Sequence, residues 1–454
     1  MNFSLQNVLI PQDESYSAID LTITDDRISA IETRTAIENC DRLLLPGFVN
    51  AHTHSTQVWQ RGLIPQLPLE LWLADLIDSS TKDLDLVYLG ALSTAVDTVL
   101  SGGTCVIDHA YLVPNREIES VAALVKGYRE VGIRAVIAPL IQDLPLPAGL
   151  PLGFPTSPYS TNETLAMMES IVQQFHQPEA GIYIGVGPTG FHRCSDALLQ
   201  GCADLSDRYN LCRHLHLLET RAQKLLAQER YGISGVEHLR NLGVLNDRTT
   251  LAHSVWISDS DIEILAETRS TVVHNPVSNL RLGSGIAPIL KCVQAGVNVA
   301  FGCDGAASND AQDLLEAIKL GTILHNISDP DYRSWLTPSS TLRMAALGGA
   351  KGIGLADQIG SIEVRKLVDF VLYDLTHPSM LPQTDLAQLL VLGRPTNVVD
   401  RVWINGKSVV ESGKILTIDT ASLYQELRDR KIPRSHFQTI NQIEARYREV
   451  MKQF

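Results

Sequence analysis

The sequence lacks any basic stretch that could follow a nucleic-acid backbone. Acidic residues outnumber basic ones, 51 to 37, so the 454-residue chain carries a formal net charge of −14. A chain with this charge repels polynucleotides on average, which disfavours nucleic acid as a partner. A small neutral or cationic ligand is unaffected by that repulsion.

The signals of export and of membrane insertion are also missing. The start, MNFSLQNVLIPQDES, has no cationic segment followed by a long apolar run, and no apolar run is long enough to span a bilayer. The seven cysteines are odd in number, scattered and without a C-x-x-C pair. They favour buried free thiols over a disulfide framework or a thiolate metal site. These absences predict a cytoplasmic protein without a membrane partner.

What is present is an ordinary globular composition, 44% hydrophobic and 19% charged, in a chain longer than one usual core. Both ends contain short apolar runs separated by turn signals, at Asp25-Asp26 and at Asn405-Gly406. We therefore expect the two ends to meet in one small domain. The predicted parts are a β-sandwich domain from 1–46 plus 360–415, a barrel over 47–359, and C-terminal helices over 416–454.

Between these ends, short apolar strands alternate with helical patterns such as LVYLGALSTAVDTVLSG and DLLEAIKLGTILHN. Eight such strands predict an α/β fold, a (β/α)8 TIM barrel. A doubly wound open sheet is the second choice, but its glycine fingerprint is absent, since GSGIAP lacks the third glycine. The candidate strands lie around Gly47–Asn50, Thr104–Asp108, Arg134–Leu140, Ile182–Val186, Leu211–Leu217, Thr249–Ala252, Ser270–Val273 and Val297–Gly302.

Polar, titratable side chains follow most of these strands. The carboxyl ends of barrel strands carry the functional residues of this fold. A divalent metal prefers imidazole nitrogens and a carboxylate, and His52 and His54, two residues apart on an extended segment, point to one side. His216 and Asp304 could complete the set from across the barrel. The strand-end residues are His52, His54, Asp108, His109, His214, His216, Glu219, His253, His274 and Asp304.

Six stretches, in order, resemble signatures of the amidohydrolase superfamily: PGFVNAHTH, HLHLLET, LAHSVW, HNPVSNLRLGSGIAPI, VNVAFGCDGAASND and GSIEVRKLVDFVLYD. The likeness covers nearly the whole chain. It is greatest to the branch that contains cytosine, guanine, 8-oxoguanine and S-adenosylhomocysteine deaminases and triazine hydrolases. The resemblance implies one divalent metal ion, usually zinc and in some members iron, and assembly as a homodimer or larger homo-oligomer.

The resemblance also implies roles for single residues. His52, His54, His216 and Asp304 match the metal ligands, Glu219 matches the proton-shuttling glutamate, and His253 matches the histidine that polarises the attacked group. A bound metal lowers the pKa of its water, and Asp304 can accept a proton from it. Glu219 can then protonate a ring nitrogen and later the leaving amine. A plain helix N-terminal acid is the alternative for Glu219.

Two departures from the superfamily pattern narrow the chemistry. Binuclear members carry a lysine at the end of strand 4, but GIYIGVGPTGFHRCS has none. One metal is therefore expected, and hydantoinase- or dihydroorotase-like chemistry is disfavoured. Adenosine-type deaminases have a histidine after the Gly-Pro of that strand, where this chain has Thr189. That difference disfavours S-adenosylhomocysteine as a substrate.

Four residues are candidates for substrate binding. Gln57 and His109 resemble positions of the 8-oxoguanine deaminase and hydroxytriazine hydrolase group, which favours a planar heterocycle without a sugar. His192 and Arg193 follow strand 4 and could bind a polar substituent. Gln57 could equally be a surface residue at a helix start. The proline-rich loop over 141–160 is either a lid or pocket wall, or a rigid surface excursion.

The sequence thus predicts a metal-dependent aminohydrolase that deaminates a purine, pterin or pyrimidine type heterocycle through a metal-bound hydroxide. The first alternative is a triazine-type hydrolase that removes chloride or an alkylamine from a heteroaromatic ring. The second is a non-catalytic binding protein that kept the barrel, but binding alone would not require Glu219 and Asp304. The small-molecule substrate itself is not named by the sequence.

Overall fold

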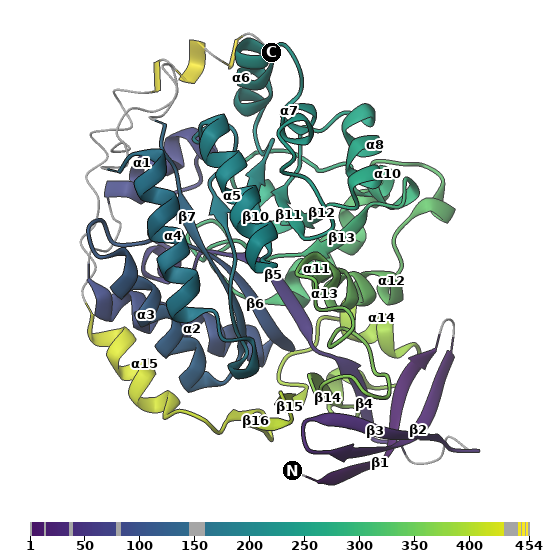
Figure 1. Cartoon of the computed structure of the whole chain (residues 1–454). Coiled ribbons are helices and arrows are strands. Elements are labelled where there is room, and N and C mark those ends of the chain that lie inside the picture. Colours follow the sequence, from purple (N-terminus) through teal and green to yellow (C-terminus); the bar gives the residue numbers. More distant parts are fainter. Residues whose placement is uncertain are drawn as a thin grey trace.

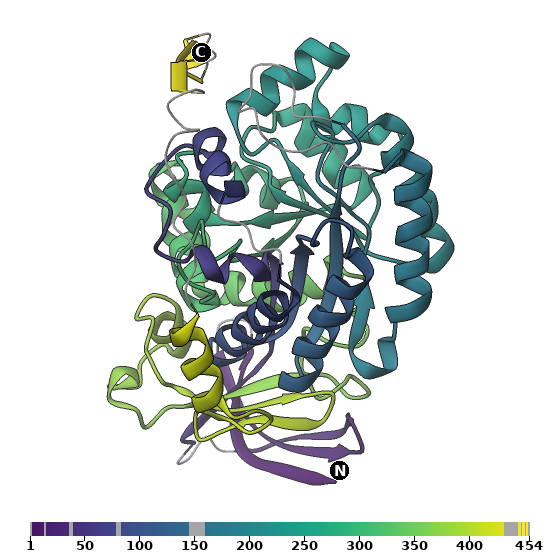
Figure 2. The same ribbon diagram turned by 90° about the vertical axis from the view of Figure 1, so that its left-hand side faces the viewer.

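The computed structural model describes residues 2–12, 15–35, 40–78, 83–144, 159–430, 444–445, 447–449 and 451–452. Its central element is a barrel of parallel strands wrapped by helices, with a separate sheet at the end where the N-terminus lies (Figures 1 and 2). The TIM-barrel fold predicted from strand–helix alternation is confirmed. The barrel strands are β5 (Phe48–Thr53), β6 (Gly103–Ala110), β7 (Arg134–Ile141), β8 (Ile182–Ile184), β9 (Gly187–Pro188), β10 (Arg213–Leu217), β11 (Thr249–His253), β12 (Thr271–His274) and β13 (Asn298–Phe301).

The barrel strands form two parallel arcs that meet at both seams. One arc runs β5-β6-β7-β8, with β9 beside β7, and the other runs β10-β11-β12-β13. At the first seam, the amide of His214 donates to the carbonyl of Val186 at 2.9 Å, and at the second the amide of Asp304 donates to the carbonyl of His52 at 2.8 Å. These bonds bring the strand ends after β5, β10 and β13 into one ring.

Side-chain caps explain where several of the helices begin. Ser160 and Glu163 form a reciprocal capping box at the helix that begins at Thr161, while Asp83, Ser195 and Thr220 cap the helices that begin at the next residue. The α-helices are α1 (Leu69–Asp78), α2 (Leu84–Leu100), α3 (Glu117–Val131), α4 (Thr161–Phe175), α5 (Asp196–Tyr209), α6 (Arg221–Tyr231), α7 (Gly235–Asn241), α8 (Asp259–Thr268), α9 (Pro276–Arg281), α10 (Ile289–Gln294), α11 (Leu314–Ile323), α12 (Pro338–Arg343), α13 (Gly349–Gly352), α14 (Leu386–Val391) and α15 (Thr420–Asp429).

Six shorter helical segments complete the pattern, and one of them carries part of the site. They are η1 (Ser55–Gln60), η2 (Pro178–Ala180), η3 (Leu324–Ile327), η4 (Tyr332–Ser334), η5 (Met344–Gly348) and η6 (Pro378–Met380). Segment η1 follows His54 directly, so it forms the wall next to the first strand end. None of the helices in the described ranges is both long and apolar enough to cross a membrane.

Strands from both ends of the chain pair in a single eight-stranded sheet, in the order β17-β16-β15-β14-β4-β1-β2-β3. The join is the antiparallel pairing of β4 with β14, from Phe370 opposite Pro46 to Asp374 opposite Arg42. The strands are β1 (Phe3–Gln12), β2 (Ser15–Thr24), β3 (Arg27–Thr33), β4 (Arg42–Pro46), β14 (Phe370–Asp374), β15 (Val399–Ile404), β16 (Lys407–Glu411) and β17 (Lys414–Ile415). The expected meeting of the two ends is thus observed, and the domain boundaries stay a prediction.

The hairpin turns lie where the sequence places them, since Asp25 (φ 58°) precedes β3, and Asn405 (φ 49°) with Gly406 (φ 73°) joins β15 to β16. Within the predicted C-terminal helices over 416–454, ASLYQELRDR and TINQIEARYREVMKQF are the two helical stretches, and the first of them corresponds to α15. Residues 145–158 of the proline-rich loop and most of the second C-terminal helix lie outside the described residues.

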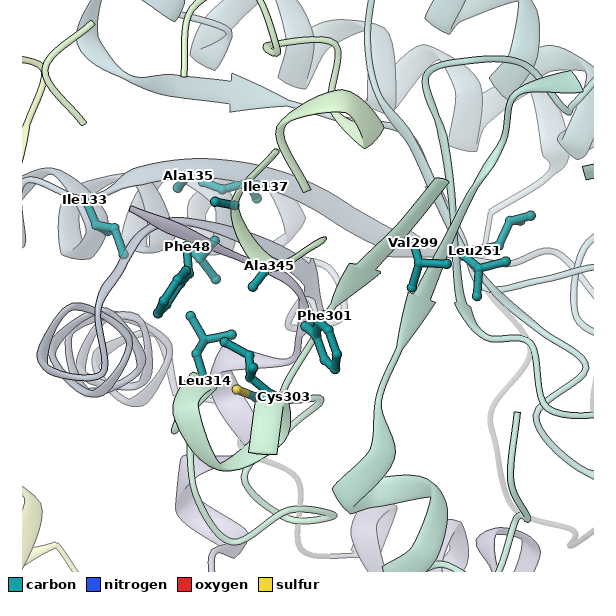
Figure 3. Close-up of a cluster of buried hydrophobic side chains, with 14 of the residues drawn as sticks. Phe48, Ile133, Ala135, Ile137, Leu251, Val299, Phe301, Cys303, Leu314 and Ala345 are labelled. Atoms are coloured by element: carbon teal, nitrogen blue, oxygen red, sulfur yellow. The ribbon is translucent and has the colours of Figure 1, made fainter. Parts of the chain in front are cut away.

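The apolar side chains of the barrel strands belong to two clusters. The smaller one includes Val49, Cys105, Ile107, Val136 and Ala300, and the larger one takes the neighbouring strand positions together with residues of the surrounding helices. Figure 3 shows part of the larger cluster, where Phe48 at the start of β5 lies beside Ile133, Ala135 and Ile137 of the β7 region, and Phe301 ends β13. All seven cysteines are buried and free, which confirms the sequence expectation. The packed barrel interior holds the strand ends in fixed positions, and this rigidity sets the geometry of the site.

Candidate metal centre and pocket

Four of the predicted metal ligands converge at the carboxyl ends of the barrel strands. His52 and His54 lie at the end of β5, His216 lies on β10, and Asp304 follows β13. The ligand atoms of His52, His54 and His216 lie within 4.8 Å of one another, and so do those of His52, His253 and Asp304. The Oδ1 atom of Asp304 is 3.4 Å from the Nε2 atom of His52 and 3.6 Å from that of His54.

Backbone carbonyls orient two of the three imidazole rings. The Nδ1 of His54 donates to the carbonyl of His109 at 2.6 Å, and the Nδ1 of His216 donates to the carbonyl of Thr189 at 3.0 Å. In a neutral imidazole, the other nitrogen then carries a lone pair. The two Nε2 atoms face each other at 3.3 Å. Two lone pairs at this distance cannot bond to each other, so the arrangement suits a shared cation.

The third ring, that of His52, is fully buried, and its Nε2 has no hydrogen-bond partner among the described residues. Burial lowers the pKa of His52 to about 3, so its ring is neutral at physiological pH. Burial alone would raise the pKa of Asp304, but the imidazole rings of His52, His253 and His54 around it hold that pKa well below the usual range. The site therefore offers three imidazole lone pairs and one carboxylate.

This donor set fits a divalent metal ion, because zinc in proteins takes imidazole and carboxylate ligands and keeps one position for water. The buried, unpartnered Nε2 of His52 supplies independent support, since such an atom is costly unless a ligand satisfies it. The second nitrogens of the rings are all engaged, as metal-binding histidines usually are. The chain therefore holds a histidine-rich metal-binding site.

Glu219 lies in the turn between β10 and α6, buried beside the candidate metal ligands. Burial raises the pKa of its carboxyl group to about 7. Its Oε2 is 3.8 Å from the Nε2 of His253, and its Oε1 accepts a hydrogen bond from the hydroxyl of Ser284 at 3.3 Å. A carboxyl group with this pKa can exchange a proton near neutrality, which general acid–base work requires.

His253, at the end of β11, donates from Nδ1 to the side-chain oxygen of Asn279 at 2.9 Å. Its backbone is left-handed (φ 74°), and so is that of Asp304 (φ 61°). Neither residue is glycine, so each conformation costs free energy that the surrounding barrel must offset. This costly geometry turns both side chains toward the metal site.

A pocket opens above these groups, and it brings together some of the predicted substrate-binding residues but not others. Gln57 and His192 line it. The side chain of His109 is fully buried and bonds to the carbonyl of Gly187 at 3.0 Å, and Arg193 is buried with its Nε donating to the carbonyl of Leu144 at 3.4 Å. Neither of these two side chains lines the pocket, and the substrate-binding roles of all four stay predictions.

The sequence predicts that segments 55–80, 141–160 and 188–196 determine specificity, and much of the pocket wall falls in them, but it does not single out the lining residues. Apolar side chains of α1 form one side, and residues on and after β6 and β7 form the other. No motif marks them, because an apolar residue on a wall helix has the same pattern as one in the core. They are Leu69, Trp72, Leu73, Leu76, Tyr111, Leu140 and Gln142.

Several supporting residues were also missed or given another role. Asn279 and Ser284 lie inside the stretch HNPVSNLRLGSGIAPI, which was recognised as a signature without roles for these two positions. From the sequence, His214 is best interpreted as a residue that fills the barrel below His216, yet its Nε2 lies 2.8 Å from the Nδ1 of His52. The spacing HLH places both histidines on one face of β10, and this was the signal that could have indicated contact with another ligand.

The comparisons with known proteins agree with this geometry. Residues 43–409 match the sequence profile described as the Amidohydrolase family. The chain belongs to this family. Across 446 residues, this amidohydrolase is 32% identical to a 5-methylthioadenosine/S-adenosylhomocysteine deaminase of Caldanaerobacter subterraneus subsp. tengcongensis, covering 95% of this chain and 98% of the relative. The family and its deaminase relatives show that the protein is a hydrolase acting on carbon–nitrogen bonds.

Two solved structures share the fold of this amidohydrolase. An adenosine deaminase from Xanthomonas campestris with bound zinc superposes with a TM-score of 0.81 at 28% identity, covering 97% of this chain and 99% of the other. An atrazine chlorohydrolase from Arthrobacter aurescens TC1 complexed with zinc gives a TM-score of 0.84 at 24% identity, covering 93% and 99%. The second likeness shows the fold alone.

Proposed function

We propose that this amidohydrolase uses one zinc ion, held by His52, His54, His216 and Asp304, to deaminate an amino-substituted nitrogen heterocycle. The observation that carries the proposal is the position of Glu219. Its buried carboxyl, with a pKa raised to about 7, lies beside the four ligands and faces His253 across 3.8 Å. A proton donor is therefore available at the place where a ring nitrogen would enter the site.

The reaction adds water to the amino-bearing carbon and releases ammonia. The bound metal lowers the pKa of water, so that a nucleophile forms near neutral pH. Asp304 accepts a proton from the attacking water. Glu219 donates its proton to the ring nitrogen, then takes the proton of the added hydroxyl group and passes it to the leaving amine, and the proton held by Asp304 restores the acid. His253 stabilises the oxygen of the tetrahedral carbon, and Asn279 holds its ring in place through the bond to Nδ1.

The pocket favours an uncharged substituent on the ring. Among the described residues that line it, there is no lysine or arginine, and the carboxylates are Glu219 and Asp304 of the site itself. The remaining wall combines apolar side chains, chiefly those of α1, with uncharged polar ones and His192. The uncharged polar residues are Thr56, Gln57, Gln60, Tyr111, Gln142, Thr189 and Gln223. The described part of this wall offers no cationic side chain to the carboxylate of an amino-acid tail, so we infer a substrate with an apolar or absent tail.

Two of the similar proteins described above support an adenine-type ring. One is named as a 5-methylthioadenosine/S-adenosylhomocysteine deaminase and the other as an adenosine deaminase. Thr189 lines the pocket, and its hydroxyl already donates to the carbonyl of Ile141 at 3.0 Å. Thr189 thus has no spare proton for a substrate. We therefore propose deamination of adenine-type compounds with uncharged substituents, in preference to S-adenosylhomocysteine.

An ammonia-release assay over a substrate panel tests this proposal. The panel contains adenosine, 5'-methylthioadenosine, S-adenosylhomocysteine, guanine, 8-oxoguanine, cytosine, a pterin and two triazines. We expect ammonia from an uncharged adenine-type compound, at a higher kcat/KM than from S-adenosylhomocysteine. Release of chloride or alkylamine from a triazine, without ammonia from any aminoheterocycle, would contradict it and select the triazine-hydrolase alternative.

Assembly as a homodimer or larger homo-oligomer, and a cytoplasmic location, stay predictions of the sequence. Light scattering after gel filtration measures the first of these directly. A monomer at micromolar concentration would contradict it.

A further inference from the structure

Among the three histidine ligands, His52 differs from His54 and His216 in the group that orients its ring. Backbone carbonyls accept the Nδ1 protons of His54 and His216, and no side-chain substitution removes a carbonyl. The Nδ1 of His52 instead faces a side chain, the Nε2 of His214, at 2.8 Å. The protonation of His52 therefore depends on a neighbour that can itself exist in two tautomers.

The tautomer of His214 depends in turn on its hydrogen bond with Thr250. The register of β10 and β11 places Thr250 directly beside His214, and its hydroxyl oxygen lies 2.7 Å from the Nδ1 of His214. The same hydroxyl donates its proton to the carbonyl of Arg213 at 3.1 Å. A hydroxyl has one proton, so while Thr250 donates to this carbonyl it accepts at its 2.7 Å contact and receives the Nδ1 proton of His214, with the thiol of Cys212 as its remaining neighbour at 3.7 Å.

We infer that His214 and Thr250 form a hydrogen-bond relay that keeps the proton of His52 on Nδ1 and its lone pair on Nε2, facing the metal. This inference rests on the metal-dependent function proposed above. With Nδ1 of His214 protonated, its Nε2 is an acceptor, and His52 must donate from Nδ1. The reverse direction would put a proton on the metal-facing Nε2 of His52 and would break the bond from Thr250 to the carbonyl of Arg213.

Because the relay is buried, the loss of one of its hydrogen bonds cannot be compensated by water. His52 and His214 are fully buried, and Thr250 is 1% exposed. Water cannot replace a missing partner there, so the loss of the hydroxyl leaves a nitrogen of His214 unsatisfied in either tautomer. His214 and Thr250 are thus positioning residues, which act on the metal through His52 and do not touch the substrate.

The decisive experiment measures the dissociation constant of Zn²⁺ from the full-length protein by competition with a chelator. Thr250→Val preserves the shape of the side chain and removes the hydroxyl. We expect its zinc dissociation constant to rise by about 10- to 100-fold, as for other residues that orient metal ligands. Thr250→Ser, which restores the hydroxyl, should stay within about 3-fold of the wild type.

Thr271→Val is the matched control. Thr271 lies beside Thr250 in the β11–β12 ladder, is also 1% exposed, and accepts a bond from the side-chain amide of Asn298 at 2.9 Å, without any link to His52. If the loss of a buried hydroxyl acted only through stability, both valine variants would bind zinc more weakly by the same factor. If Thr250→Val binds zinc as tightly as Thr271→Val, the relay is refuted.

A second pair of variants decides the question if Thr250→Val does not fold. His214→Gln offers an amide oxygen near the place of Nε2, while His214→Met fills the space without an acceptor. We expect the glutamine variant to bind zinc about 10-fold or more tightly than the methionine variant. Equal affinities overturn the relay alone, whereas a wild-type protein that does not bind zinc overturns the proposed function and the relay together.

Discussion

At the scale of single residues, the site combines a histidine whose pKa is lowered with a carboxyl group whose pKa is raised. Burial lowers the pKa of His52 to about 3 and raises that of Glu219 to about 7. The histidine is thereby kept neutral and able to bind a cation, while the carboxyl group can hold a proton at neutral pH. Burial thus prepares both the ligand and the acid, because it disfavours the charged form of each.

Replacement of Glu219 by glutamine should abolish most of the activity and leave the metal in place. We expect kcat to fall by about 10²- to 10⁴-fold, since the variant cannot transfer a proton to the ring. Zinc content should stay at the wild-type value, because no ligand changes. Steady-state ammonia assays and metal analysis measure the two effects.

Glu70→Gln serves as the control for that variant. Glu70 is also buried, and burial raises its pKa as well, but it does not line the pocket. The charge of Glu70 is a minor contribution to the raised pKa of Glu219, after burial, His253 and Asp304, so we expect kcat to change by less than about 10-fold. A loss of activity as large as that of the Glu219 variant would show that burial of an acid, and not its place in the site, causes the effect.

Glu219 should also reduce the stability of the metal-free protein as the pH rises. Its pKa is raised from 4.5 to about 7 in the folded state, so its favourable contribution is complete below 4.5 and is lost as the pH rises through about 7. Glu219→Gln removes this penalty. At pH 8 the variant should exceed the wild type in free energy of unfolding by on the order of 3 kcal/mol.

Urea unfolding of both metal-free proteins at pH 4.5 and pH 8 measures this difference. The gap between the variant and the wild type should be much larger at pH 8. An equal gap at the two pH values would mean that the carboxyl group of Glu219 is not perturbed in the folded protein.

At the scale of elements, the strand ends supply the chemistry and α1 supplies the pocket wall. The strand ends could be predicted, because parallel strands bring their carboxyl ends to one edge and the polar residues there have few other reasons to occur. The segment that forms the wall could be predicted, but its single residues could not, because Trp72 and its apolar neighbours on α1 have the same pattern as core residues. Their function depends on where the helix lies, which tertiary packing decides.

Trp72 connects the wall to the loop after Asp304. Its indole Nε1 donates to the carbonyl of Ala307 at 3.2 Å, and its ring packs with Ile64, Leu69 and Leu282. Trp72→Ala should reduce the free energy of unfolding by about 3–5 kcal/mol and should raise KM more than it lowers kcat. Chemical unfolding and steady-state kinetics test both statements.

Trp72→Phe keeps most of the packing and loses the hydrogen bond, so it should cost only about 1 kcal/mol and leave KM close to the wild-type value. If the phenylalanine variant raises KM as much as the alanine variant, the indole N–H, and not the apolar surface, determines substrate binding.

At the scale of the whole molecule, the barrel and the terminal sheet are joined by a buried ion pair. Arg134 at the start of β7 bonds through Nη2 to Oδ1 of Asp369 at 2.9 Å and through Nε to Oδ2 at 3.1 Å, and each side chain is 1% exposed. Asp369 also accepts from the backbone amide of Asn405 at 2.8 Å. The two parts are therefore expected to unfold together.

Asp369→Asn leaves the buried guanidinium of Arg134 without its counter-charge. The free energy of unfolding should fall by about 3–5 kcal/mol, as is usual when one partner of a buried pair is removed. The exposed pair of Arg61 and Asp97 provides the control, and Asp97→Asn should cost less than about 1 kcal/mol. Similar losses for the two variants would show that Arg134 is not buried as described.

The sequence also predicted the meeting of the chain ends in one sheet, from apolar runs and turn residues at both termini. It did not predict the relay of His214 and Thr250, because the contact between His214 and His52 crosses the barrel between residues 162 positions apart. Local patterns identify which residues face the interior. Which interior residues touch is set by the closure of the barrel.

The measurement that tests the central claim most directly is ammonia release by the zinc-loaded protein, with the Glu219→Gln variant assayed in parallel. We predict ammonia from an adenine-type compound with an uncharged substituent, and a rate lower by at least about 10²-fold for the variant. No ammonia from any aminoheterocycle of the panel, or equal rates for the two proteins, would contradict the claim.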